Sequence, residues 1–429
     1  MPIQVRREMI VSASGTAVSE SRRQYYIDRG LTRRETRAFE SQSDTSDYTE
    51  YRDSSDNGKT WGAWIREKAA TKEPLGEDSV AEESYPCGKY IWNPVHQHFV
   101  SLIYKQIYVG GYETATNHYW CGGRGASAHT YLEICDCERK RLSMMLVKYE
   151  DGPQFDKETY QTSGFLDSNL GIGTFIAVME CGDILFDLWI PVDVCCKIMD
   201  LNVHSVFPSA PKQPDALLIC RGKWNSDTFC YDLTFTPIVL DDRQSSRGIS
   251  EPVIAELKSG KILVVFRASN LILPRWNPRI SPYAPGYKFF CLSDDGGKSF
   301  SPPMPWHFDS REVVYSPATY SVMLRSEANG KLYWIGNITD PTKTYSNYPR
   351  WPLQIVEVDE EWGVARKDTL TIIDTRREGE TELVQLSNFG FLQDRETGNI
   401  EIYLTKYGQF PDRHTRDCEV WKYTVILPR

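Results

Sequence analysis

The sequence lacks several features that would assign it to a common class of protein. Its 429 residues contain no run of 18 apolar side chains, so no membrane-spanning helix is predicted. P-loop, GxGxxG and heptad patterns are absent, which argues against nucleotide-binding and coiled-coil architectures. The 49 Lys and Arg residues are outnumbered by 58 Asp and Glu residues and form no dense block, which disfavours a nucleic-acid partner. An anionic small ligand is still compatible with the net charge of −9, because a local cluster of cations can oppose the overall sign.

The N-terminus and the cysteines bear on the cellular location. The first residues, MPIQVRREMIVSASG, include no apolar segment of signal-peptide type, although a mature secreted chain would look the same. Among 11 cysteines, Cys135/Cys137 and Cys195/Cys196 are closely spaced, but neither pair has a second pair at zinc-site spacing. We therefore expect mostly buried free thiols and a cytoplasmic location, or a secreted one if a signal peptide has been removed.

Short apolar segments joined by Gly-containing turns recur along the chain. Four stretches have the form strand, turn, strand, and a fifth is a weaker copy; they are 173–192, 252–270, 320–339, 389–408 and, the weaker one, 87–109. These hairpins begin about 65 to 85 residues apart, which indicates a repeat. Each is followed by further strand-like segments, so that one repeat holds the four antiparallel strands of a propeller blade.

The predicted fold is therefore an all-β propeller of four-stranded antiparallel blades, formed by residues 1–429 as a single domain. The five repeats and an N-terminal unit at about 20–65 make six blades, and a seventh is left open. The last repeat is one strand short and ends in EVWKYTVILPR. The first segment, QVRREMIVSAS, can supply the missing strand and close the ring without an open edge.

One turn motif occurs twice. Residues 54–61, SSDNGKTW, match S-x-D-x-G-x-T-W, and residues 293–300, SDDGGKSF, match it with Ser for Thr and Phe for Trp. In such a turn the Asp accepts backbone amides, the Gly adopts the required backbone shape, and the aromatic ring packs between strands. The motif resembles the Asp-box, or BNR repeat, of sialidase-like β-propellers. In that family the Asp-boxes are structural and lie opposite the active site, so the resemblance implies no chemistry for Asp56 or Asp295.

A finer resemblance extends from about residue 50 to 410. This part is similar to a group of sialidase-like propellers that includes rhamnose–glucuronate lyases, ulvan lyases and rhamnosidase-like enzymes; the segments that carry the similarity are 128–134, 146–156, 220–224, 315–321, 330–339 and 385–390. The resemblance implies an enzyme of carbohydrate metabolism acting on an anionic oligosaccharide or polysaccharide, without a membrane partner.

This sequence departs from the pattern that a sialidase itself would show. It would need three arginines on the ligand carboxylate, an early Arg-Ile-Pro segment, and a Tyr–Glu pair for the nucleophile. Arg-Ile-Pro is absent, and Arg33 and Arg34 lie in a different pattern, LTRRETRAF.

Candidate site residues follow from the faces of the propeller. If the Asp-boxes mark one face, strand alternation places the loop between the second and third strands of each blade on the other. Such long loops on a rigid scaffold commonly carry binding residues. The loop of the second blade, 108–131, holds His118, Arg124 and His129; that of the third blade, 192–215, holds His204, and Arg221 follows on the next strand. For Arg221 the structural alternative is a salt bridge to a neighbouring blade.

The later blades place polar side chains at comparable strand ends. Glu251 begins the inner strand of the fourth blade, while Arg267 and Asn270 follow its second strand. Comparable positions in the fifth and sixth blades are Tyr315, Asn337, Arg350, Gln385 and Asn388. This recurrence favours a ligand-lined central pocket over a plain water-filled channel.

These residue types favour β-elimination from a uronate. Arginine neutralises the sugar carboxylate, a neutral His removes the C5 proton, and a Tyr or a second His protonates the leaving oxygen. We assign His129 or His118 as the base, Arg221 and Arg267 to the carboxylate, and Tyr315 or His204 as the acid. The predicted substrate contacts are Arg124, Glu251, Arg267, Asn270, Asn337 and Arg350.

Hydrolysis and simple binding are the alternatives. Hydrolysis needs two paired carboxylates, and the available acids, Asp167, Glu251 and Glu256, form no recognisable pair. The leading hypothesis is a lyase that cleaves a rhamnose–glucuronate linkage, with an exo-sialidase or other glycoside hydrolase, and a non-catalytic carbohydrate-binding propeller, as alternatives. Calcium or another divalent cation in the channel is left open, although no DxDxDG loop marks a site.

Overall fold

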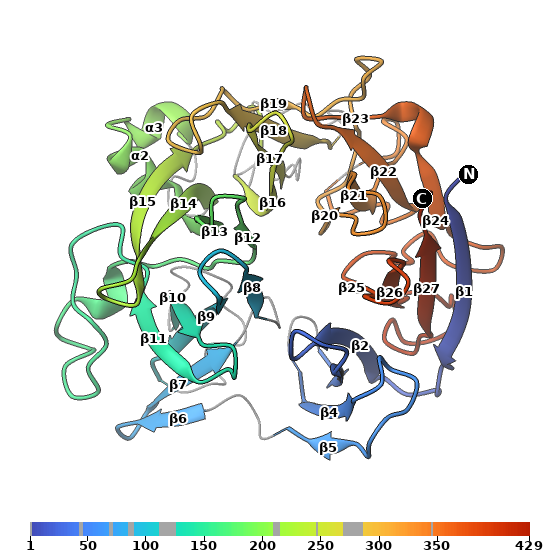
Figure 1. The fold of residues 1–429 in the computed structure, drawn as a ribbon, viewed down its shortest axis with the longest axis horizontal. Helices are drawn as coiled ribbons and strands as arrows, with labels where there is room; N and C mark the ends of the chain where they lie inside the picture. The colour runs from blue at the N-terminus through green and yellow to red at the C-terminus, as the bar shows by residue number, and fades with distance from the viewer. Residues whose placement is uncertain are drawn as a thin grey trace.

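The computed structural model describes residues 2–42, 46–67, 72–84, 90–110, 126–208, 215–245, 248–268, 286–344 and 346–429. Within these residues, the strands form six antiparallel sheets arranged around a ring (Figure 1). The prediction of an all-β propeller is confirmed, and the number of blades is six.

Three blades follow the four-stranded plan in simple chain order. Blade 1 contains β2 (Ser19–Tyr26), β3 (Arg33–Glu40), β4 (Tyr48–Ser54) and β5 (Ile65–Arg66). Blade 3 contains β12 (Ile176–Val178), β13 (Ile184–Pro191), β14 (Asp215–Asn225) and β15 (Cys230–Ile238). Blade 4 contains β16 (Ser250–Glu256), β17 (Ile262–Arg267), β18 (Lys288–Ser293) and β19 (Met304–Pro305).

Blades 2 and 5 carry additional strands. Blade 2 contains β6 (Lys72–Leu75), β7 (Ser79–Ser84), β8 (Ile91–Asn93), β9 (His98–Tyr108), β10 (Ala126–Cys135) and β11 (Arg141–Leu146). Blade 5 contains β20 (Val322–Arg325), β21 (Leu332–Asn337), β22 (Leu353–Asp359), β23 (Val364–Ala365) and β24 (Thr371–Asp374). The hairpin of β6 and β7 pairs with β9, and β24 pairs with β22; neither addition is anticipated by the repeat pattern.

The sixth blade joins the two ends of the chain. It contains β25 (Gly390–Gln393), β26 (Ile400–Thr405) and β27 (Val420–Ile426), and its outer strand is β1 (Gln4–Val11). β1 pairs antiparallel with β27, from Gln4 opposite Ile426 to Val11 opposite Val420. The ring is thereby held together by backbone hydrogen bonds between its first and last strands.

The hydrophobic core lies between neighbouring blades. Alternate residues of one strand point to opposite faces of its sheet, so each middle strand serves two cores. On β17, Val264 packs in the cluster shared by blades 3 and 4, whereas Val265 packs in the cluster shared by blades 4 and 5. Burial on both faces is why this strand reads ILVVF, a continuous apolar run without polar alternation.

Both Asp-boxes connect the third and fourth strands of their blades and share one geometry. In the first, Ser54 Oγ donates to Asp56 at 2.7 Å, and Thr60 donates its N–H at 2.8 Å and its hydroxyl at 2.6 Å. In the second, Ser293 and Ser299 make the corresponding bonds to Asp295 at 2.7, 2.9 and 2.6 Å. These bonds hold the pKa of each aspartate well below its usual value.

Two short helices in the β13–β14 connection were not predicted. They are α2 (Val192–Ile198) and α3 (Val203–Val206). Val192, Cys195 and Cys196 of α2 share one helix face and are buried against blade 3, so the adjacent cysteines are core residues. All nine cysteines within the described residues are free thiols, and six of them are buried.

A buried carboxylate supports the inner end of blade 3 and yields a pH prediction. Asp187 on β13 accepts hydrogen bonds from Thr174 N at 2.9 Å and Thr174 Oγ1 at 3.0 Å, just before β12. Complete burial raises its pKa to about 7, against opposing hydrogen bonds. The folded state therefore holds this proton more tightly than the unfolded chain. The contribution of the Asp187 proton to the free energy of unfolding is complete below about pH 4, and it is lost as the pH rises to about 7.

We therefore expect Asp187→Asn, which stays neutral, to gain stability relative to the wild type as the pH rises from 4.5 to 7.5. The relative gain is on the order of a few kcal/mol. Urea unfolding of both proteins at the two pH values measures it, and titrations of other groups cancel in the comparison. An unchanged difference between the proteins at the two pH values would show that Asp187 titrates alike in both states.

Candidate functional site

The connections opposite the Asp-boxes form one hydrogen-bonded surface over blades 4 to 6. We call this the upper face; it carries Arg267 and Tyr315, whereas the opposite face is the Asp-box face. Tyr315 O accepts from Thr339 N at 2.9 Å, which joins the blade 4–5 connection to the end of β21. Leu386 N donates to Arg350 O at 2.8 Å and joins the next connection to the same surface.

At the upper end of blade 4, Glu251 and Arg267 form an ion pair. Arg267 ends β17, and its Nη1 donates to Glu251 Oε2 at 2.8 Å. Glu251 begins the inner strand β16, where the pairing register shifts between Ser250 and Val253. Its backbone takes a φ of 47°, which is uncommon for a residue with a side chain and is typical of strand irregularities that redirect a side chain. Both side chains are half-buried.

A third charged residue, Lys288, lies beside this pair. It begins β18 directly opposite Arg267 in the sheet, is 1% exposed, and donates from Nζ to Thr319 O. Burial lowers the pKa of Lys288 to about 7; the nearby Glu251 carboxylate raises it, and Arg267 and Arg350 lower it further. Lys288 is therefore within electrostatic range of the three other charged groups. We call Glu251, Arg267, Lys288 and Arg350 the cationic cluster.

Arg350 reaches this cluster from the β21–β22 connection of blade 5. Its guanidinium donates to Gln385 Oε1 at 2.8 Å, to Ser387 Oγ at 3.3 Å and to Asn347 O at 3.1 Å. These bonds hold the half-buried guanidinium on the connection between blades 5 and 6.

Asn337 lies beneath the segment that carries Arg350. The prediction that Asn337 contacts the substrate is corrected, because the side chain is buried. The side chain is fully buried at the end of β21. Its amide nitrogen lies within hydrogen-bond distance of Arg350 O at 3.2 Å, Pro352 O at 2.9 Å and Leu386 O at 3.1 Å. Asn337 is therefore a positioning residue, because two of these contacts are to the backbone segment that carries Arg350 and the third is to the neighbouring β24–β25 connection.

The two predicted histidines within the described residues, His129 and His204, do not lie at the cationic cluster. His129 is 0% exposed, its ring stacks on Phe165 with centroids 3.9 Å apart, and burial lowers its pKa to about 4. His204 is exposed on α3, at the outer edge of the ring (Figure 1). The prediction that these two rings converge over the channel is corrected, since one is packed in the core and the other lies on the rim. His118, Arg124 and Asn270 lie outside the described residues.

Arg221 points to the Asp-box face. It donates to Asp183 Oδ2 at 3.0 and 2.6 Å, and to Gly296 O in the Asp-box of the next blade at 2.8 Å. β14 runs from the upper face to the Asp-box face, and Arg221 lies in its second half. The assignment of Arg221 to a sugar carboxylate is therefore corrected, and its structural alternative, a bridge to a neighbouring blade, is what the structure contains.

Lys288 is the cluster member that sequence reasoning missed. It precedes the apolar segment FFCL, so it mirrors Arg267, which follows the apolar segment ILVVF. A cation at the upper end of each of two adjacent strands is the signal that could have revealed it. Within the described residues, no group of three or more His, Cys, Asp or Glu side chains could hold a metal ion, and no helix is long and apolar enough to cross a membrane.

The comparisons with known proteins support the fold. No protein-family model and no curated protein matches the chain. A solved structure of unknown function from Dyadobacter fermentans DSM 18053 aligns over 99% of both chains with a TM-score of 0.58 and 12% identity. The NanB sialidase from Streptococcus pneumoniae, in complex with 2-[(3-chlorobenzyl)ammonio]ethanesulfonate, aligns over 99% of this chain and 70% of its own, with a TM-score of 0.51 and 10% identity. The fold is thus a sialidase-like six-bladed propeller.

Proposed function

We propose that this chain is a carbohydrate-active enzyme whose active site is built on the cationic cluster. The observation that carries the proposal is the grouping of two guanidinium groups, Arg267 and Arg350, and the buried Lys288, whose pKa is about 7, with a single carboxylate on the upper face, in a chain of net charge −9. Such a local excess of positive charge attracts an anionic ligand. Half-buried guanidinium groups bind a carboxylate with two parallel hydrogen bonds, and Arg267 and Arg350 both present such a group.

The substrate we propose is an oligosaccharide with a uronate unit, of the rhamnose–glucuronate type. The sequence resembles lyases for such linkages, and a structural neighbour is named a sialidase, so a sugar ligand has a precedent on this fold. In this proposal Arg267 and Arg350 bind the uronate carboxylate, and Glu251 orients Arg267.

The reaction we propose is β-elimination. Neutralising the carboxylate acidifies the C5 proton; a base removes it, the C4–O bond breaks, a C4=C5 double bond forms, and the leaving oxygen takes a proton. Tyr315, half-buried on the upper face, is the group we assign to that last transfer. His118 is the remaining candidate for the base. Hydrolysis is less well supported, because Glu251 is the one carboxylate of the cluster and is already paired with Arg267.

Incubation with a rhamnose–glucuronate oligosaccharide tests the proposal. We expect reducing ends and the ultraviolet absorbance of an unsaturated uronate to rise together. Reducing ends without that absorbance would indicate hydrolysis, and binding without either signal would indicate a non-catalytic propeller. The absence of both binding and cleavage would contradict the proposed substrate.

A further inference from the structure

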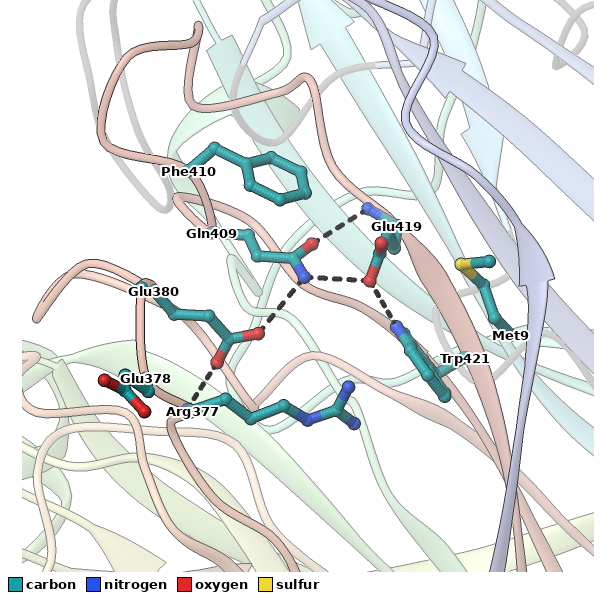
Figure 2. Close-up of a pocket in the computed structure, with 9 residues that line it drawn as sticks. Met9, Arg377, Glu378, Glu380, Gln409, Phe410, Glu419 and Trp421 are labelled. Carbon is teal, nitrogen blue, oxygen red and sulfur yellow. Dashed lines mark hydrogen bonds between the residues drawn. The ribbon is translucent and has the colours of Figure 1, made fainter.

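A pocket lies on blade 6, apart from the residues of the cationic cluster. Its volume is about 400 Å³, within the range of small-ligand sites, and its lining residues are Met9, Arg377, Glu378, Gly379, Glu380, Gln409, Phe410, Glu419 and Trp421 (Figure 2). β1 and β27 provide one wall, and the β24–β25 and β26–β27 connections, both on the upper face, provide the rest.

A hydrogen-bond network holds the walls of this pocket. Figure 2 shows Gln409 between Glu380 and Glu419; its Nε2 donates to Glu380 Oε1 at 3.1 Å and to Glu419 Oε2 at 2.8 Å. Trp421 Nε1 donates to the same Glu419 oxygen at 2.8 Å. The pocket is therefore preformed, with the carboxylates and the indole ring fixed relative to one another.

The negative charge of Glu380 is balanced by a buried lysine, Lys406. Lys406 is 0% exposed, donates to Glu380 Oε1 at 2.6 Å and lies 3.5 Å from Asp374 Oδ2. A buried cation in this place lets Glu380 serve as a hydrogen-bond acceptor in the wall.

One polar atom of the pocket is left for a ligand. Both hydrogen bonds that Glu419 accepts within the described part of the chain end on Oε2, which leaves Oε1 available as an acceptor.

We infer that this pocket binds a neutral pyranose unit. A hydroxyl group can donate to Glu419 Oε1, while the C–H face of the sugar packs on Phe410. An anionic unit is disfavoured because three glutamates line the pocket against one arginine. An organic cation is disfavoured because the Arg377 guanidinium already lies 4.4 Å from the Trp421 ring centroid.

The test uses two methyl glycosides as probes and saturation-transfer NMR to measure binding. Methyl α-rhamnoside is the neutral probe, a choice that rests on the proposed function, and methyl glucuronide is the anionic one. We expect Phe410→Ala and Glu419→Gln each to weaken binding of the neutral probe at least tenfold, and Arg221→Ala, on the Asp-box face, to leave it unchanged. Phe229→Ala, which removes an exposed ring from the β14–β15 turn, is the matched control for Phe410→Ala.

Two results would overturn the inference: no binding of methyl α-rhamnoside and of a second neutral probe, methyl β-glucoside, or equal binding by the wild type and both pocket variants. Two variants are used because Phe410 contributes a ring and Glu419 an acceptor, so misfolding of one leaves the other informative. The proposed function is tested separately, by measuring whether Arg267→Ala weakens the binding of methyl glucuronide.

Discussion

Replacing Arg33 by Met is expected to destabilise the protein by about 3 to 5 kcal/mol. The side chain is 2% exposed at the start of β3, and its guanidinium reaches from blade 1 into blade 6. It donates to Asp394 Oδ2 at 2.5 Å, to Glu401 Oε2 at 2.9 Å and to Asn57 Oδ1 at 2.8 Å. Without Arg33, both carboxylates stay at the boundary of the two blades and lose a cation that compensates for their burial.

Urea unfolding measures this effect, and the next residue supplies the control. Arg34 pairs with Asp53 at 2.7 and 2.8 Å, but both side chains remain partly exposed, so Arg34→Met is expected to cost less than about 1 kcal/mol. Adding Asp394→Asn to Arg33→Met should recover part of the loss, since it removes the carboxylate that loses its ion pair, whereas Glu401 keeps Lys422 at 2.8 Å. Equal destabilisation by the two arginine substitutions would show that the blade 1–blade 6 contact does not depend on Arg33.

Arg267→Ala is expected to lower kcat/KM on the uronate oligosaccharide by about 10²- to 10³-fold, if Arg267 binds the carboxylate as proposed. Arg267→Lys keeps the charge but loses the planar fork, so an intermediate loss is expected. The rate of formation of the unsaturated uronate measures both.

Arg221→Ala is the matched control for this prediction. Arg221 is also half-buried and bound to a carboxylate, but it lies on the Asp-box face, so kcat/KM of the folded variant should stay near that of the wild type. A loss of activity in Arg221→Ala together with normal activity in Arg267→Ala would place the site on the opposite face.

Contacts within a few residues were predictable from the sequence. The Asp-box is one example, because all the groups that Asp56 binds lie between Ser54 and Thr60. The hairpins are another, because an apolar segment, a Gly-containing turn and a second apolar segment pair with each other whatever surrounds them.

The direction of an arginine side chain was not predictable in this way. Arg221 and Arg267 both adjoin apolar segments, yet one ends on the Asp-box face and the other on the upper face. His129 is a second example: it was predicted to lie in the loop 108–131, but the structure places it in β10, where Phe165, from the blade 2–blade 3 connection, covers its ring.

The sequence by itself determined the all-β propeller and its repeating blades, because hairpin and turn patterns act over short stretches of chain. The tertiary structure alone decided that Glu251, Arg267 and Arg350 all act on Lys288 and that Arg33 belongs to the contact between blades 1 and 6. The reason is geometric: closing the ring brings together charges that are far apart along the chain. Only that closure determines which of them are buried, which are paired and which remain open to a ligand.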